Sequence, residues 1–384
     1  MQAKLQGWKA RILSQVGRTS LIKSVLQSMP LYTFQCFKVP ETICRKLDAI
    51  VKAFWWGHDL GTRKLHLIGW DKICQAKSNG GLGFRKFNAF NQAMLTKQFW
   101  RIQNYPDSLL ARTSKAKYFP KTHLQGYIPK PNHSWTWKNI AKPQFAELGK
   151  GRWLVGSGHQ ISLQHPDWFH IPYHILRDHN LLNGTMVDLI HPNTKTWNWD
   201  LLGRLYDHNT CVEINKIPIA KTDRVPNTLT WKYSNSGEYN VAKAYSLIQQ
   251  IQDITTRPDH IIEDIPQFVW KALWKVKLPM KITTFIWKLL HDSLLVLTNL
   301  IRRGIQIANR CLMCDEGEET MSHLFLQCPF AKAVWYSSSL GIRTSELNHL
   351  SMKHWLLGHI TATNMPVQTK QSSRQSIFTI LWTI

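Results

Sequence analysis

Four metal-ligating side chains lie within 18 residues of one another in the last quarter of the chain. Cys311, Cys314, His323 and Cys328 follow the pattern C-x2-C-x8-H-x4-C. Three thiolates and one imidazole complete the tetrahedral shell that Zn2+ prefers, and such a closed shell leaves no position for water or substrate. The pattern therefore predicts one structural zinc ion that stabilises a small fold and takes no part in chemistry.

The residues around this cluster support that interpretation. Two residues separate Cys311 from Cys314, so a tight turn can direct both sulfurs at one ion. The segment 323–328 is predicted to be a short helix ended by Pro329, which presents His323 and Cys328 from the other side. Two alternatives stay open: a CxxC redox pair, for which no βαβ setting is apparent, and cysteines without any ligand.

The positive charge of the chain is concentrated in its N-terminal part. Residues 1–150 carry 25 lysines and arginines against 6 acidic residues, so they hold +19 of the total charge of +24. A field of this strength attracts polyanions, because each neutralised phosphate releases condensed counterions. RNA or DNA is therefore the predicted partner, whereas the alternative is a solvated surface whose long side chains cover a helical core.

Composition limits the class of protein further. A chain of 384 residues with 43% hydrophobic content and 18 tryptophans is long enough for two or three packed domains. No stretch has the roughly 18 apolar residues of a membrane span, and the first residues lack a signal-type apolar core. Seven cysteines, an odd number, fit reduced thiols. We expect an intracellular protein of the nucleus or cytoplasm that is neither secreted nor attached to a membrane.

Helical periodicity dominates the basic region. Two short amphipathic helices are predicted over 5–16 and 21–29, separated by a capped break at 17–20. If these helices are roughly collinear, Lys4, Arg11 and Arg18 lie near one line and can follow a phosphate backbone. An extended segment is predicted over 31–38, and a helix over 42–56 ends at a glycine.

Two further features of this region have more than one interpretation. The pair Trp55-Trp56 can stack on bases, but it continues an apolar helical stripe, which favours a place in the core. The glycine-rich segment 79–84 resembles a phosphate cradle only superficially, because no lysine and hydroxyl pair follows it. A turn that needs positive φ is the better account.

The rest of the chain divides into a loop-rich part and a second helical part. Residues 121–238 are rich in Pro, Gly, Asn, His and Trp, and short strands are predicted at 152–155 and 228–233. The second of these is expected to form a hairpin with 238–241. Helices are predicted over 242–251, 268–274, 282–290 and 292–301. The predicted fold class is mainly α with a small β-containing middle segment, a helical basic N-terminal region and a small CCHC zinc-binding domain.

The order of short motifs resembles the C-terminal region of plant LINE-type, non-LTR retrotransposon reverse transcriptases. The matching stretches are 4–9, 13–27, 54–57, 80–83, 151–158, 269–287 and 299–304, followed by the cysteine and histidine cluster. The resemblance implies a connector region at 1–120, a loop-rich segment at 121–238, a reverse-transcriptase zinc-binding domain at 239–335 and a linker toward a ribonuclease H domain at 336–384. The family's zinc ligands fall on the four residues named above.

The catalytic parts of such an element are not found in the sequence. Reverse transcription needs paired carboxylates for two metal ions, and no Asp-Asp pair occurs here. We expect the chain to begin after the polymerase palm and to stop before the ribonuclease H carboxylates. It is then a noncatalytic nucleic-acid-binding fragment, with a reverse-transcriptase core as a possible partner in trans. The alternatives are a domesticated protein-binding zinc adaptor and a non-functional polymerase relic. The candidate phosphate contacts are Lys4, Lys9, Arg11, Arg18, Lys23, Arg302, Arg303 and Arg310.

Overall fold

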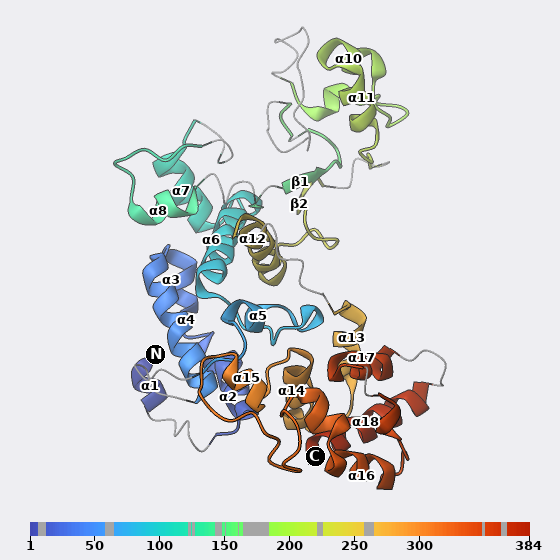
Figure 1. The fold of residues 1–384 in the computed structure, drawn as a ribbon. Helices are drawn as coiled ribbons and strands as arrows, with labels where there is room; N and C mark the ends of the chain where they lie inside the picture. The colour runs from blue at the N-terminus through green and yellow to red at the C-terminus, as the bar shows by residue number, and fades with distance from the viewer. Residues whose placement is uncertain are drawn as a thin grey trace. The chain divides into compact units, whose positions relative to one another are not determined.

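A computed structural model describes most of the chain. The described residues are 1–6, 13–57, 65–121, 124, 127–142, 148–149, 151–159, 161–163, 184–220, 226–256, 265–347, 350–361 and 367–384. Within these ranges the fold is mainly helical with one two-stranded sheet, which confirms the predicted class (Figure 1). The chain forms two compact units, one of residues 1–29, 45–86 and 259–384 and the other of residues 30–44 and 87–258.

The first unit holds both ends of the chain. Its helical elements are α1 (Gln2–Gln6), α2 (Gln15–Leu21), the π-helical turn η1 (Ile22–Leu26), α5 (Trp70–Cys74), the 3-10 turn η2 (Lys77–Asn79), α13 (Gln267–Lys275), α14 (Met280–Leu290), α15 (Leu297–Ile301), the π-helical turn η5 (His323–Gln327), α16 (Pro329–Ser337), η6 (Thr344–Leu347), α17 (Met352–Thr361) and α18 (Val367–Thr383). Helix α4 (Glu41–Trp56) begins in the second unit and continues in the first.

The predicted break at 17–20 is wrong. The Ser14 hydroxyl accepts the Gly17 N–H at 3.2 Å and caps α2, so one helix starts at Gln15 and continues into η1. Thr19 strengthens this arrangement, because its hydroxyl donates to the Gln15 carbonyl and accepts the indole N–H of Trp55 at 3.0 Å. A cap one turn earlier than expected therefore removes the break.

A tryptophan-rich core supports the first unit. Trp55 is fully buried and makes edge-to-face contacts with Phe84 and Trp287, with ring centroids 6.1 and 6.3 Å apart, which confirms its place in the core. Gly80 adopts φ +80°, and a Cβ there would lie 2.8 Å from the ring of Trp270. The Gly80 carbonyl accepts hydrogen bonds from Trp287 and His291, both at 2.7 Å. The glycine-rich turn is thus a structural junction that needs positive φ, as the sequence predicts.

The helix predicted over 292–301 is shorter than expected. Asp292 adopts φ +50°, which ends α14 and sends the chain through a turn, so that α15 covers Leu297–Ile301 alone. Asn299 is buried and donates to the carbonyls of Asp292 and Leu294, both at 3.1 Å, which holds that turn. None of the helices in the described ranges combines the length and the apolar character that a membrane crossing requires.

The second unit contains the sheet and the aromatic clusters. Its elements are α3 (Leu31–Cys36), α6 (Phe87–Asn104), α7 (Leu109–Tyr118), α8 (Trp135–Ile140), β1 (Gly151–Leu154), η4 (Met186–Leu189), α10 (Trp199–Leu205), α11 (His208–Asn215), β2 (Thr228–Trp231) and α12 (Val241–Thr256). The extended segment predicted over 31–38 is wrong. Residues 31–36 form α3 because Phe34 packs edge-to-face against Phe87 and Phe90 of α6.

The predicted hairpin also differs from the structure. Strand β2 pairs antiparallel with β1, where Gly151 lies opposite Trp231, and residues 241–256 form a helix. The turn before α12 remains, since the Trp231 N–H donates to the Gly237 carbonyl. Buried Trp231 decides the pairing, because its indole N–H donates to the Leu148 carbonyl at 2.8 Å and its ring packs on Tyr239. Contacts distant in sequence therefore outweigh the local hairpin signal.

Candidate metal centre

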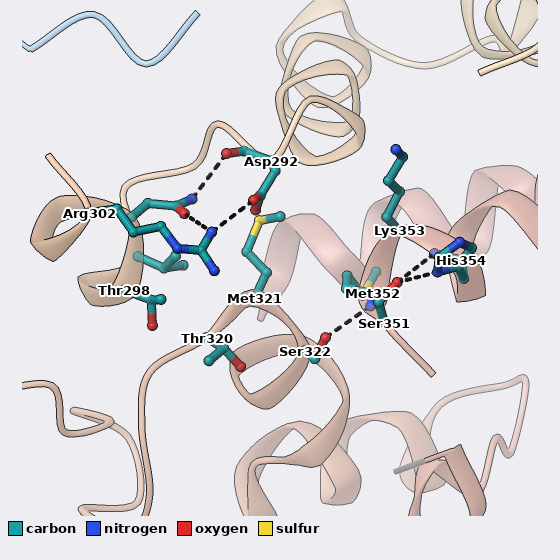
Figure 2. A pocket seen from close by; sticks show the side chains of 12 residues that line it. Asp292, Thr298, Arg302, Thr320, Met321, Ser322, Ser351, Met352, Lys353 and His354 are labelled. Carbon is teal, nitrogen blue, oxygen red and sulfur yellow. Dashed lines mark hydrogen bonds and ion pairs between the residues drawn. The ribbon is translucent and has the colours of Figure 1, made fainter. Parts of the chain in front are cut away.

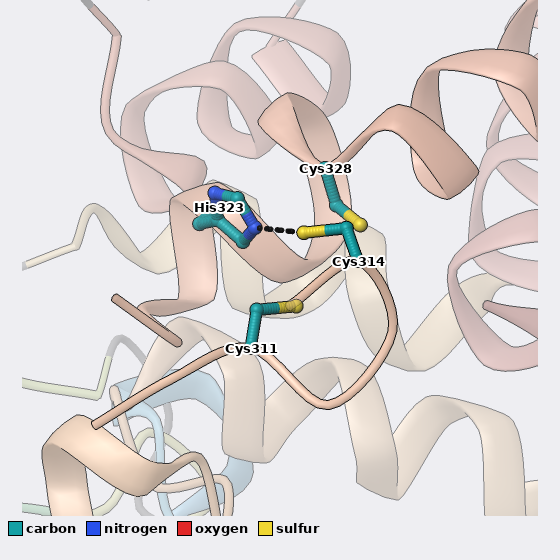
Figure 3. Close-up of side chains that lie close together, drawn as sticks. All are labelled: Cys311, Cys314, His323 and Cys328. Carbon is teal, nitrogen blue, oxygen red and sulfur yellow. Dashed lines mark hydrogen bonds between the residues drawn. The ribbon is translucent and has the colours of Figure 1, made fainter. Parts of the chain in front are cut away.

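The four predicted ligands lie together in the first unit (Figure 3). Their nitrogen and sulfur atoms all lie within 4.8 Å of one another. A tetrahedral zinc ion with bonds of about 2.3 Å to sulfur separates its sulfur ligands by about 3.8 Å. The Cys314 sulfur and the Nε2 atom of His323 are 3.3 Å apart. The donor set and its spacing thus fit one zinc ion.

The first pair of ligands lies in a tight loop. The Asp315 N–H donates to the Cys311 carbonyl at 2.8 Å, and the Cys311 N–H donates to the Gly317 carbonyl at 3.1 Å. Asp315 and Gly317 adopt φ of +56° and +69°, which turns the chain back on itself. The Glu316 N–H donates to the Cys314 sulfur at 3.4 Å. This loop directs both sulfurs to one side, as the CxxC spacing predicts.

The second pair lies on a short helical turn. His323 begins the π-helical turn η5, and the Cys328 N–H donates to the His323 carbonyl at 2.7 Å. Cys328 itself is extended, with φ −58° and ψ 134°, as is usual for a residue that precedes proline. Pro329 was expected to end this helix, but it also occupies the first turn of α16, where its missing N–H removes no hydrogen bond.

The thiols are crowded in a way that a cation would relieve. Desolvation, together with hydrogen bonds to the thiols of Cys311 and Cys328, raises the pKa of Cys314 to about 11, against an opposing bond to the Glu316 backbone. Cys311 and Cys328 are buried. A divalent ion favours the thiolate form and binds as protons leave, so this arrangement suits a metal better than a free redox pair.

Glu319 has a supporting role that the sequence did not reveal. An acidic side chain between the two pairs of ligands would ordinarily be solvated, but Glu319 is only 7% exposed. Its carboxylate accepts the Leu297 N–H at 3.0 Å, and its carbonyl accepts the Thr298 hydroxyl at 2.7 Å. Asn309 accepts the Glu319 N–H at 3.1 Å. These bonds fix the loop to α15. No sequence pattern indicates them, because they depend on the burial of Glu319 in the folded chain.

A pocket of about 380 Å3 has the residues that directly precede His323 in its wall (Figure 2). It is lined by α15, the segment 320–322 and the start of α17. Arg302 forms an ion pair with Asp292 at 3.3 Å on one wall. The Ser322 hydroxyl accepts the Met352 N–H at 3.0 Å, and Ser351 bonds to His354 at 2.7 Å. The first of these two bonds links α17 to the residue before His323 and so braces the ligand turn.

The comparisons with known proteins agree with this centre. A model of the family described as zinc-binding in reverse transcriptase matches residues 239–335, which contain all four ligands. A putative ribonuclease H protein of Arabidopsis thaliana is 28% identical over 372 residues, covering 94% of this chain and 58% of its own length. An uncharacterized mitochondrial protein of the same plant is 36% identical over 114 residues, covering 29% of this chain and 74% of its own length.

The chain belongs to the plant retrotransposon-derived reverse transcriptases. The match confirms the resemblance seen in the short motifs. This reverse-transcriptase region spans 58% of the length of the putative ribonuclease H protein. It contains the family's zinc-binding domain, and Cys311, Cys314, His323 and Cys328 form a potential zinc site in it.

The structure places most of the candidate phosphate contacts of this reverse-transcriptase region. Lys4 is exposed on α1, whereas Lys9 and Arg11 lie outside the described residues, so the row through Lys4, Arg11 and Arg18 stays a prediction. Arg18 donates to the Trp55 carbonyl at 3.1 Å, and burial lowers its pKa. The Arg18 guanidinium therefore links α2 to α4.

Lys23 belongs to a group of three cations from separate segments. Its Nζ atom lies 5.9 Å from the centre of the Phe84 ring. Desolvation lowers the pKa of Lys23 to about 8, and the positive charges of Lys77 and Arg85 lower it in addition. Lys77 in turn lies 4.6 Å above the Trp274 ring. Lys77 and Arg85 carry no distinctive sequence pattern, so their proximity to Lys23 follows from the fold alone.

The three arginines near the metal centre are exposed. Arg302 pairs with Asp292 at 3.3 Å, Arg310 pairs with Asp315 at 3.4 Å, and Arg303 donates to the Leu67 carbonyl at 3.2 Å. Exposed ion pairs of this kind contribute little to stability, and water or another anion replaces them readily. Their guanidinium groups are consequently accessible to phosphate.

Proposed function

We propose that this region is a noncatalytic nucleic-acid-binding module of a LINE-type element, with one structural zinc ion and a basic surface that binds the phosphates of RNA or DNA. The observation that carries the proposal is the Cys3His set beside exposed Arg302, Arg303 and Arg310. A closed donor set offers no position to a substrate, so its contribution is structural: it holds the loop that follows Arg310. Glu319 ties this loop to α15, the helix that ends just before Arg302 and Arg303.

The distribution of charge supports a polyanionic partner. The chain carries +24, of which +19 lies in residues 1–150. Lys23, Lys77 and Arg85 approach one another in the first unit although their like charges repel. A phosphate placed among them would remove that repulsion, and the released counterions would make binding strongly salt-dependent.

The proposal assigns no chemistry to this chain. No Asp-Asp pair occurs in its sequence, and two-metal polymerases hold their ions with paired carboxylates. One relative has ribonuclease H in its name, but the chain covers only 58% of that relative's length. The name therefore describes the relative and is not transferred to this chain. A reverse-transcriptase core acting in trans would supply catalysis, and the complex would work inside the cell, in the nucleus or cytoplasm.

Zinc, when bound, neutralises the thiolates and links the two halves of the loop. The chain itself supplies the rest of the support. The Glu316 N–H stabilises the Cys314 sulfur, Glu319 ties the loop to α15, and Ser322 ties the ligand turn to α17. These contacts hold the zinc loop and the ligand turn in place, and in this proposal the side chains that make them do not themselves contact nucleic acid.

Metal analysis of purified protein tests the zinc site. We expect one zinc per chain by mass spectrometry, and Cys314→Ser should lose it and unfold the segment around 300–335, because structural zinc contributes folding free energy directly. Cys36→Ser is the matched control, since Cys36 is exposed and lies outside the cluster. Unchanged metal content and an unchanged melting temperature in Cys314→Ser would rule the site out.

Salt-dependent RNA binding tests the basic surface. Replacing Arg302, Arg303 and Arg310 with glutamine should flatten the plot of log affinity against log salt by about 0.7 for each lost single-strand phosphate contact. Lys216→Gln is the control, because Lys216 is also exposed and also pairs with a carboxylate. An unaltered slope in the triple variant would remove the three arginines from the interface.

A second candidate function is that of a protein-binding zinc adaptor. The tip of the zinc loop favours it, because Leu312 and Met313 are 84% and 48% exposed there beside acidic Asp315 and Glu316. Nucleic-acid binding that is weak and independent of salt, together with a specific protein partner, would support the adaptor. A zinc-free, aggregated chain would instead indicate a relic of the polymerase.

A further inference from the structure

The second unit carries an exposed aromatic pair that lies outside the zinc-binding domain. Phe37 follows α3 and Trp135 begins α8, and their rings stack with centroids 5.8 Å apart and planes inclined by 26°. Phe37 is 43% exposed and Trp135 is 51% exposed. Two large rings that stack on each other in contact with water present a flat apolar surface that a ligand can cover.

Both rings are held in place by the surrounding structure. The Phe37 carbonyl accepts a hydrogen bond from buried Asn91 at 2.8 Å. On the other side, the Trp137 ring stacks on the rings of Tyr118 and Phe119, at centroid distances of 4.5 and 5.6 Å. These contacts fix α8 to the neighbouring α7 (Figure 1). Because the pair is positioned before any ligand arrives, little conformational entropy is lost on binding.

The Tyr118 hydroxyl adds a second link between these helices. It bonds to the Ser134 hydroxyl at 2.9 Å, and Ser134 in turn caps α8 by accepting the Trp137 N–H. Trp135 is therefore the first residue of a helix whose start is fixed on both sides. The ring of Trp135 stays outside the cluster that α7 and α8 form with α6.

The chain around this pair is basic and contains no acidic residue over a long stretch. Between Asp107 and Glu147 the sequence holds seven lysines and arginines and no aspartate or glutamate. These cations are Arg112, Lys115, Lys117, Lys121, Lys130, Lys138 and Lys142. Lys138 lies one helical turn after Trp135, which places both residues on one side of α8.

Further positive charge comes from the residue after Phe37. Burial lowers the pKa of Lys38, and the charge of Lys142 lowers it in addition, whereas Cys44 and Glu41 act in the opposite direction. The Nζ atom of Lys38 donates to the Asn88 side chain at 3.1 Å. Lys38 follows Phe37 directly in the chain, and Lys142 comes two residues after α8, the helix that Trp135 begins. Each ring thus has a cation on its own segment, which makes the surface complementary to a polyanion.

We propose that Phe37 and Trp135 form a stacking platform for the bases of single-stranded nucleic acid, with Lys38, Lys138 and Lys142 near its phosphates. The inference rests on the proposed nucleic-acid-binding function and adds the class of ligand and its point of contact. Every base has a π face, so such a platform accepts any sequence. The positive field favours a nucleic acid over a protein segment as the occupant of this surface.

Binding of a fluorescently labelled single-stranded RNA to the full chain tests the platform. We expect Trp135→Ala to weaken binding about 5- to 150-fold, the effect of losing one stacked base. The slope of log affinity against log salt should stay the same, because no phosphate contact is lost. Trp135→Phe should recover most of the affinity, since it keeps a π face. Lys138→Gln should flatten the slope.

Two controls separate stacking from loss of structure. Trp199→Ala is the matched variant, because Trp199 is 44% exposed at the start of α10 but is followed by Asp200, and its RNA affinity should equal that of the wild type. An abasic oligonucleotide with an intact phosphodiester backbone is the matched ligand. Wild type and Trp135→Ala should bind it equally, because it has no base to stack.

The possible failures are distinguishable. Equal RNA affinity of Trp135→Ala and the wild type, or the same loss on the abasic strand, would overturn the platform while leaving nucleic-acid binding in place. Wild-type protein that binds no RNA at low salt would overturn the proposed function and the platform together. Self-association of the wild type that Trp135→Ala abolishes, with RNA affinity unchanged, would show that the pair binds protein.

Discussion

His291 makes the stability of the first unit depend on pH. Its ring stacks on Trp270 with centroids 4.9 Å apart, and its Nε2–H donates to the Gly80 carbonyl at 2.7 Å. Burial lowers its pKa to about 4; the Gly80 bond opposes this, and the charges of Lys72 and Lys353 add to it. The buried ring is therefore neutral at physiological pH.

The size and sign of the effect follow from linkage. The unfolded chain takes up a proton near pH 6.5, whereas the folded chain takes it up near pH 4. The contribution of His291 to the free energy of unfolding is fully present above the pKa of the unfolded chain. It is lost as the pH falls from that value to the pKa of the folded chain, and it changes no further below that. A difference of 2.5 pKa units corresponds to about 3 kcal/mol in full and about 2 kcal/mol near pH 5.

Urea unfolding of wild type and His291→Gln at neutral pH and near pH 5 measures this contribution. Glutamine keeps a donor for the Gly80 carbonyl but does not titrate, so the variant should lose about 2 kcal/mol less than the wild type on acidification. Loss of zinc in acid affects both proteins and cancels in the difference. His354→Gln, at an exposed position, should behave as the wild type. An identical acid response of wild type and His291→Gln would refute the reasoning.

Two substitutions test other contacts, each by the midpoint of urea unfolding. Gly81→Ala places a Cβ 1.9 Å from the Gln75 carbonyl oxygen and should destabilise the fold by about 3 kcal/mol. Gly203→Ala is the control, because no atom lies within 4 Å of its new Cβ, and it should be neutral or slightly stabilising. Equal midpoints of the two variants would contradict this expectation. Asn91→Ala removes hydrogen bonds of 2.8–3.0 Å to the backbone of Val39, Phe34 and Phe37, and should lower the free energy of unfolding by about 2–4 kcal/mol. Asn132→Ala, at an exposed position, is the control and should change it little. A wild-type midpoint for Asn91→Ala would show that water replaces the amide.

The candidate metal centre was predictable because its signal is local. Zinc ligands are soft or borderline donors at short separations, so the spacing of Cys311 and Cys314 alone is enough to predict a metal site. The helix α4 was predictable for a related reason, since an apolar stripe with a period near 3.6 fits one regular structure. In both cases the residues that form the pattern are close in the sequence, and residues close in the sequence are also close in space.

Two of the errors occurred where distant residues decide the local structure. Residues 31–36 alternate like a strand, but burial of Phe34 against α6 makes them helical. Residues 228–231 were assigned to a local hairpin, but Trp231 draws them to β1. A short segment has little intrinsic preference, so the free energy of burying one large side chain is enough to choose its conformation.

The sequence by itself determined the family, the helical class, the basic character and the four residues of the potential zinc site, because composition and spacing act without reference to the rest of the fold. Only the tertiary structure decided which charges and rings meet. In the folded chain Lys77 and Arg85 lie near Lys23, and the Phe37 ring stacks on the Trp135 ring at the surface. Glu319 is buried there and binds the Leu297 N–H, which supports the loop between the two pairs of ligands. These partners are far apart along the chain, and packing of the core alone fixes their distance.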